Sequence, residues 1–115
     1  MLNVVGGTQG VGTGVLIRAA EPLEGIQLMQ ARRGLTNLTD LARGPGKLAQ
    51  AFEITLGLSD IDMTEEGPLW LGRIDRPAGQ IGVSVRIGIT KEADRPLRFY
   101  ERGSKYVSGR KTLNV

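Results

Sequence analysis

The stretch IGVSVRIGI, residues 81–89, decides the fold class of this 115-residue chain. A β-branched residue occupies every odd position, and glycine, serine or arginine occupies every even position. A period of two is typical of a β-strand with one apolar face, so we predict that Ile81, Val83, Val85, Ile87 and Ile89 form the core face. The other face carries almost no side chain except Arg86, which predicts that another group lies close against that backbone.

Further strands are predicted on both sides of this one. Residues 96–102, PLRFYER, are predicted to form the last strand, and residues 68–71, PLWL, are a strand candidate. Residues 2–5 and 15–20 are predicted to form a hairpin around the glycine-rich turn 6–14. That turn leads into a strand and lacks the Lys-Ser/Thr ending of a P-loop, so a hairpin is favoured over a phosphate loop.

The middle of the chain has the spacing of helices. Residues 24–34, 35–43 and 44–54 each repeat apolar side chains at helical intervals. Gly34 stands where a C-cap belongs, and Pro45 stands at a helix start. Strands followed by helices and then by strands predict an α+β fold, and the length predicts one domain over residues 1–115.

Composition excludes several kinds of chemistry. The chain has no Cys and no His, which excludes disulfides, thiol nucleophiles, histidine acid–base catalysis and the usual zinc sites. No apolar stretch is long enough to cross a bilayer and no secretory signal is visible, so we expect a cytoplasmic protein without membrane contact.

Charge is unevenly distributed along the chain. Residues 53–66 hold five acids and no bases, whereas residues 86–111 hold eight bases against three acids. This arrangement presents an oriented field in which a polyanion would meet the basic side, although composition alone favours a chance asymmetry.

The stretch RPLRFYERGSKYVSGR, residues 95–110, is the main candidate for meeting DNA. Cations alternate there with aromatic and hydroxyl groups, an array that suits backbone phosphates on a duplex more than stacking of single-stranded bases. The candidates are Arg98, Tyr100, Arg102, Ser104 and Lys105. The alternative is a solvated edge strand kept soluble by its cations.

The segment GPGKL, residues 44–48, is a second candidate for a phosphate contact. Gly44 and Gly46 open a helix whose free N–H groups, with Lys47 one turn in, can cradle a phosphate. An ordinary proline-initiated helix with an exposed lysine explains the same residues equally well.

Two polar residues interrupt apolar strands. Arg18 lies in the predicted apolar strand 15–20 and needs a partner for its charge, which Glu21 or Glu24 can supply as an ion pair. Alternatively, Arg18 orients an anion or a water in a pocket. Asn3 is most simply an edge residue, although an amide can also read or exclude a base edge.

Three blocks of the sequence resemble a known family. The blocks GVLIRAAEPLEGIQLM (14–29), RGPGKLAQAF (43–52) and RPLRFYERGSKYVSGR (95–110) resemble, in order and spacing, the 3-methyladenine DNA glycosylase family of the alkyladenine type. The resemblance runs from Asn3 to about Ser108.

The resemblance implies a fold and an activity. The fold is a single domain in which helices flank an antiparallel curved β-sheet. The activity is hydrolytic removal of alkylated or deaminated purines from duplex DNA by a monomer that flips the nucleotide into a pocket. No metal and no organic cofactor is implied.

The resemblance also implies roles for individual residues. Arg18 matches an arginine that helps to hold the attacking water, and Ile87 matches a residue whose backbone carbonyl touches the same water. Asn3 matches an asparagine whose amide crowds the 2-amino group of guanine. Lys47 and the basic cluster from Arg98 to Lys105 fall where the family meets DNA phosphates.

The chain departs from the family pattern in its catalytic motifs. The family's general base is a Glu in an ETEAY-like motif and its intercalating Tyr lies in a YGM-like motif, and neither is matched here. Glu21 and Glu24 belong to the EPLEG block and do not replace that base. We therefore expect an N-terminally truncated domain with impaired excision. The alternatives are a non-catalytic DNA-binding module and a chain that does not fold stably alone.

Overall fold

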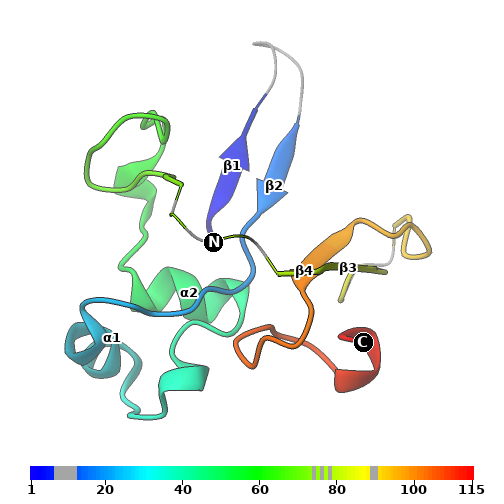
Figure 1. Cartoon of the computed structure of the whole chain (residues 1–115). Helices are drawn as coiled ribbons and strands as arrows, with labels where there is room; N and C mark the ends of the chain where they lie inside the picture. Colours follow the sequence, from blue (N-terminus) through cyan, green and yellow to red (C-terminus); the bar gives the residue numbers. More distant parts are fainter. Residues whose placement is uncertain (7–12, 74, 76, 78, 89–90) are drawn as a thin grey trace.

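The computed structural model describes residues 1–6, 13–73, 75, 77, 79–88 and 91–115 and shows an α+β chain, as predicted. The strands and helices are β1 (Asn3–Val5), β2 (Gly14–Leu16), α1 (Ile26–Arg33), α2 (Pro45–Ala51), β3 (Ile81–Ser84) and β4 (Arg98–Glu101). Short 3₁₀ turns cover Leu38–Asp40, Leu56–Leu58 and Lys111–Leu113. The helices lie on one side of the molecule and β3–β4 on the other, with the β1–β2 hairpin between them (Figure 1). No helix in these described ranges is long and apolar enough to span a bilayer.

The core lies around the two helices. Its buried members are Met29, Leu41, Ala42, Leu48 and Ala51. Leu2 and Ile17 pack against them from the hairpin, which anchors the N-terminal strands to the helices. Polar contacts also join the helices, because Arg33 donates to the Gln50 side chain at 2.8 Å and Gln50 donates to the Arg32 carbonyl at 2.9 Å.

Both helix ends follow the local signals in the sequence. Gly34 adopts the left-handed conformation at the end of α1, and its N–H bonds the carbonyl of Gln30. Pro45 is the first residue of α2, where its missing N–H costs nothing. These two predicted boundaries are confirmed.

The helix predicted over residues 35–43 is wrong. Only a 3₁₀ turn forms at Leu38–Asp40, and the Asn37 side chain caps it by accepting from the N–H of Thr39. The chain then extends at Arg43, which forms a β-bridge with Ala19. A continuing helix would have prevented that bridge, because helical and extended backbone are mutually exclusive.

The strands form two separate two-stranded antiparallel sheets in the described part of the chain, β1–β2 and β3–β4. Each ladder is shorter than the sequence predicted. The strand predicted over 15–20 ends at Leu16, the one over 81–89 ends at Ser84, and 68–71 is not a strand. Ile89 and most of the predicted turn 6–14 lie outside the described residues.

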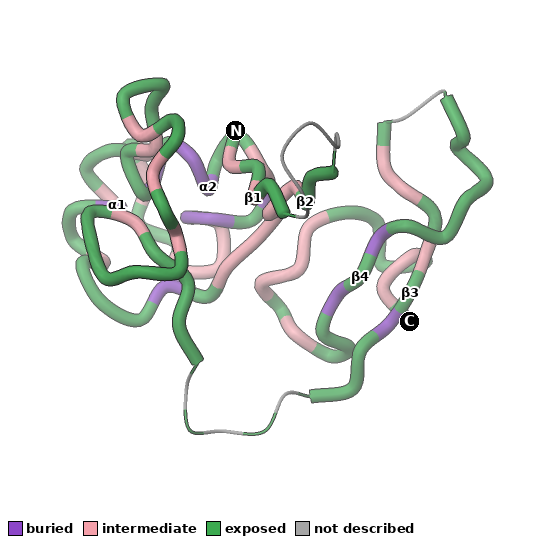
Figure 2. The backbone as a smooth tube through the Cα atoms, turned by 90° about the horizontal axis from the view of Figure 1, so that it is seen from above, coloured by how far each residue is buried: buried purple, intermediate pink, exposed green. Residues whose placement is uncertain are grey.

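The prediction that the odd positions of β3 form a core face is wrong. Ile81 is 55% exposed and Val83 48%, whereas Gly82 on the opposite face is buried. The ring of Tyr100 on β4 lies against Gly82, where any Cβ would clash with it. The prediction that a group lies close against this bare backbone is therefore confirmed. Figure 2 shows the alternation along β4, where buried and exposed residues follow each other.

Candidate functional site

A pocket of about 1200 Å³ opens between the segment that follows β2 and the strand β4 with its following loop. Its walls come from residues 14–21, 97–101 and 103–108, which are far apart in sequence. Asn3, Arg18 and Ile87 all line it. The structure thus brings these three candidates together around one space, while the roles assigned to them remain predictions.

Arg18 is half-buried in this pocket and lies beyond the end of β2, not within a strand as predicted. Its Nε atom is buried and has no hydrogen-bond partner within the described residues. Among the described residues no ion pair joins Arg18 to Glu24. Glu21 lines the same pocket and has an interaction of its own, so its pairing with Arg18 stays a prediction. A buried guanidinium nitrogen without a partner favours an acceptor supplied from outside, such as an anion or a water.

Arg98 is the most buried charged residue that the structure describes, at 4% exposure. It donates to the Ser84 hydroxyl at 2.8 Å, to the Ser108 carbonyl at 2.6 Å and to the Asn114 side chain. Its guanidinium carbon also lies 4.7 Å from the centre of the Tyr100 ring. These contacts tie β3, β4 and the C-terminal turn together.

The predicted exposure of the Arg98 and Tyr100 face is therefore wrong. Tyr100 is buried beside Arg98, and its hydroxyl donates to the Val115 carbonyl at 2.7 Å. The odd residues Leu97, Phe99 and Glu101 are exposed instead. The sequence could not distinguish the two faces, because charged and apolar groups occur on both and only the C-terminal turn decides which face is covered.

Arg86 also lines the pocket, although sequence reasoning assigned it no role. It donates to the carbonyls of Lys91 and Glu92 at 2.9 and 3.2 Å, and its Nε is buried without a partner within the described residues. The signal in the sequence was its position as the lone long side chain on the glycine-rich face of residues 81–89.

Cations outnumber carboxylates among the side chains that line the pocket. Its walls carry the cations Arg18, Arg86, Arg98 and Lys105, and the carboxylates Glu21 and Glu101. Burial, and secondarily the charge of Arg18, lower the pKa of Arg98 from its ordinary value, while Tyr100 acts in the opposite direction. Arginine nevertheless stays protonated in proteins, so Arg98 brings a fixed positive charge to the site.

The remaining candidates divide between the pocket and the surface beside it. Ser104 and Lys105 line the pocket, whereas Arg102, Gly44, Gly46 and Lys47 do not. Arg43 connects the two groups, because it precedes Gly44 and its Nη1 donates to the Lys105 carbonyl at 3.5 Å. Arg102 and Lys47 are exposed, and the stem of Lys47 lies over Gly44.

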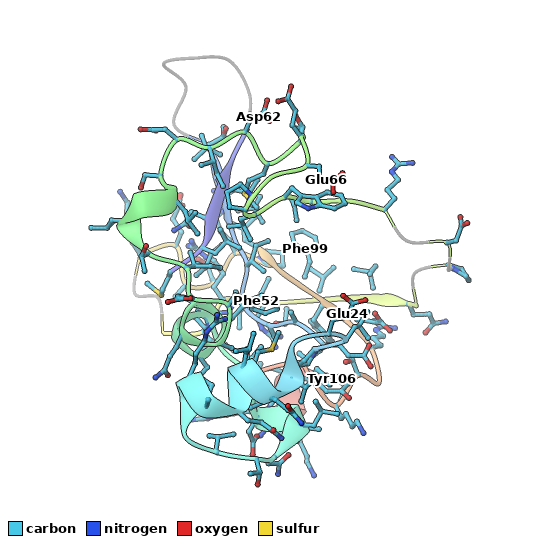
Figure 3. All side chains as sticks on the ribbon, turned by 90° about the vertical axis from the view of Figure 1, so that its left-hand side faces the viewer. Glu24, Phe52, Asp62, Glu66, Phe99 and Tyr106 are labelled. Carbon is cyan, nitrogen blue, oxygen red and sulfur yellow. The ribbon has the colours of Figure 1, made fainter. Side chains whose placement is uncertain are left out.

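The acidic segment, residues 53–66, lies away from the basic residues of the C-terminal part, 102–115 (Figure 1). In Figure 1 the segment after α2, in green, and residues 102–115, in orange and red, occupy opposite sides of the molecule. Figure 3 shows the same separation, with Asp62 and Glu66 far from Tyr106. In the described part of the chain no group of three or more acidic, His or Cys side chains is arranged to hold a metal.

Comparison with known proteins identifies relatives over nearly the whole chain. Residues 1–105 match the model of the family described as methylpurine-DNA glycosylase. A protein of Mesorhizobium japonicum, named as a 3-methyladenine DNA glycosylase, is 56% identical over 98% of this chain and 54% of its own length. Proteins of the same name from Paraburkholderia phytofirmans and Methanoculleus marisnigri are 46% and 50% identical over 100% and 95% of this chain. The chain spans about half the length of these curated relatives.

Proposed function

We propose a function from one established premise: the chain belongs to the methylpurine-DNA glycosylase family. It binds duplex DNA that carries an alkylated or deaminated purine, receives the flipped base in the pocket, and hydrolyses its N-glycosidic bond slowly. The observation that supports this is the meeting of Asn3, Arg18 and Ile87, from three separate segments, around one pocket.

Arg18, Ile87 and Asn3 each have a separate role in the pocket. The partnerless Nε of Arg18 donates to a water, and the backbone carbonyl of Ile87 accepts from the same water. The water attacks the sugar carbon, the bond to the purine nitrogen breaks, and the base leaves with the bonding electron pair. The proton that the water loses passes to the departing base or to solvent. Asn3, exposed at the start of β1, presents its amide to the base and disfavours the 2-amino group of guanine.

We expect slow hydrolysis because the carboxylates that line the pocket do not match the family's general base. Glu21 and Glu101 line the pocket in the described part of the chain, and neither belongs to a motif like the family's general base. A water that attacks without a nearby base remains a weak nucleophile at neutral pH.

DNA approaches from the basic side. The exposed cations Arg102 and Lys105, and Lys47 beyond the Arg43–Lys105 contact, lie beside the mouth of the pocket and take backbone phosphates. The neighbouring Ser104 hydroxyl and the exposed backbone at Gly46 supplement them, whereas Gly44 is buried under the stem of Lys47. Arg98 and Tyr100 support this surface from beneath rather than touching DNA, because both are buried.

The test is a single-turnover assay with excess protein on duplexes that carry one hypoxanthine or one alkylated purine, scored by alkali-labile abasic sites. We expect slow release by the wild type and no release by Arg18→Ala. Arg73→Ala, at an exposed arginine outside the pocket, should release the base as the wild type does. Equal release by the wild type and Arg18→Ala would exclude this pocket as the site. Release as fast as by the full-length Mesorhizobium relative would refute the argument from the missing base.

A second function, DNA binding without chemistry, is favoured by the same lack of a matching general base. It predicts salt-sensitive retention on duplex DNA, equal for damaged and undamaged sequences, with no abasic sites. Preference for the damaged duplex would favour the glycosylase pocket even where release is slow, because only an extruded base reaches Asn3.

A further inference from the structure

A second pocket, of about 450 Å³, lies where the backbone after β3 meets the C-terminal turn. Figures 1 and 2 show that turn beside the β3–β4 sheet. Arg86 and Ile87 also line the larger pocket that holds Arg18, so the two pockets share part of a wall. The walls of the second pocket include Arg86, Ile87, Gly88, Gly109, Arg110 and Thr112.

The side chains around the second pocket carry positive charge and no negative charge. Among the described residues that line it, Arg86 and Arg110 are charged and none is acidic. The larger pocket differs in this respect, because Glu21 and Glu101 stand among its cations. An anion that enters the second pocket therefore meets two cations that no lining carboxylate neutralises.

Arg86 has a donor left over after its contacts with the chain. Its Nη2 donates to the carbonyls of Lys91 and Glu92 at 2.9 and 3.2 Å, which hold one edge of the guanidinium in place. The Glu92 carboxylate is directed to Arg95 instead, at 3.4 Å. The Nε of Arg86 is buried and has no partner within the described residues. A buried guanidinium N–H without an acceptor is costly, so it indicates an acceptor that comes from outside the chain.

The opposite wall of the second pocket supplies further donors. Arg110 and Thr112 line it with exposed side chains, so a guanidinium and a hydroxyl can reach a ligand there. Gly109 lets this wall approach Arg86, because its φ of 98° is left-handed and a Cβ there would stand 2.5 Å from Cδ1 of Ile87. Two guanidinium groups and a hydroxyl suit a phosphate group, whose oxygens accept hydrogen bonds from several directions. A planar carboxylate is satisfied by one guanidinium alone.

We propose that the second pocket binds a phosphate group through Arg86, Arg110 and Thr112. A backbone phosphate of duplex DNA and free inorganic phosphate offer this same chemistry. Arg110 and Thr112 lie beyond residues 1–105, the part of the chain that matches the family model, so this contact is additional to those around the larger pocket. The inference rests on the residues of the second pocket and does not require that a glycosidic bond is cleaved.

Arg110→Gln is the test variant, because it removes one charge of the pocket at an exposed side chain. Lys111→Gln is the matched control, since it removes the same charge at an exposed residue that does not line the pocket. Inorganic phosphate is titrated into each protein at an ionic strength held constant with chloride, and the amide NMR signals of Gly109 and Thr112 are followed. We expect saturable shifts in the wild type and in Lys111→Gln. Binding should be about tenfold weaker in Arg110→Gln, which loses a charge-assisted hydrogen bond.

Binding to an undamaged DNA duplex identifies the source of the phosphate. If a backbone phosphate occupies the pocket, Arg110→Gln lowers the affinity for the duplex more than Lys111→Gln does and flattens its salt dependence by about 0.9. If only the free anion binds, the two variants bind the duplex equally while their phosphate titrations still differ. The proposal is overturned if the two variants behave alike in both measurements. Because no lesion is present, that result is distinct from a failure to release a base.

Discussion

The ring of Tyr100 lies directly on the backbone of Gly82, its cross-strand partner. The contact is possible because Gly82 has no side chain, and the Tyr100 hydroxyl then reaches the carbonyl of Val115 at the end of the chain. Covering this face of the sheet turns Val83 and Phe99 outward. One glycine therefore decides which side of the sheet the chain itself covers.

Replacing Gly82 should destabilise the chain. A Cβ there would stand within 2.6 Å of the Tyr100 hydroxyl oxygen, so the ring must move and lose its contact with Val115. We expect Gly82→Ala to lower the free energy of unfolding by about 1–3 kcal/mol, measured by urea denaturation. Gly46→Ala is the control: its Cβ would meet nothing within 4 Å and it lies in α2, so a gain of about 0.5–1 kcal/mol is expected.

Arg98 should prove to be a structural residue. Arg98→Lys keeps the charge but replaces two separate donor nitrogens by one: Nη1 donates to Ser84, and Nη2 donates to Ser108 and Asn114. We expect a loss of about 1–3 kcal/mol in the free energy of unfolding. Arg102→Lys, at an exposed site, should leave stability unchanged within about 0.5 kcal/mol. Equal effects of the two substitutions would contradict the buried network.

DNA retention should depend on the exposed cations beside the pocket. Arg102→Glu combined with Lys105→Glu is expected to weaken binding to duplex DNA at low salt and to flatten its salt dependence by about 0.9 per lost phosphate contact. Fluorescence anisotropy at several salt concentrations measures both. Arg73→Glu is the control, since it changes net charge equally per residue outside this surface. Unchanged retention in the double variant would show that these residues form only a solvated edge.

The acidic segment contains a turn whose titration can be followed. Hydrogen bonds from the Thr64 hydroxyl and, secondarily, the Thr64 N–H lower the pKa of Asp62 below its ordinary value. A lowered pKa in the folded state means that the turn is stabilised above the unfolded-state pKa and that this contribution is lost as pH falls through the folded-state pKa. Thr64→Val should raise the pKa of Asp62 toward its ordinary value, as read from a carboxyl-carbon NMR titration. An unchanged titration would show that the hydroxyl does not stabilise the carboxylate in solution.

Local signals in the sequence determined most of the element types and several of their ends, although residues 35–43 and 68–71 did not form the predicted helix and strand. Gly34 and Pro45 mark helix ends because their backbone preferences act within one turn of chain. The alternation in residues 81–89 correctly indicated a strand, since its period depends only on neighbouring residues. The family resemblance likewise named Asn3, Arg18 and Ile87 as candidates without any coordinates.

Only the tertiary structure decided which faces are buried and which candidates meet. Arg98 and Tyr100 are covered because the C-terminal residues Ser108, Asn114 and Val115 bond to them. The alternating pattern of a strand does not predict contacts with residues so far along the chain. Arg86 and Arg18 line one pocket because segments distant in the sequence meet there. Burial is a property of pairs of segments brought together in space, so a pattern along one segment predicts the period of a strand but not the side on which it will be covered.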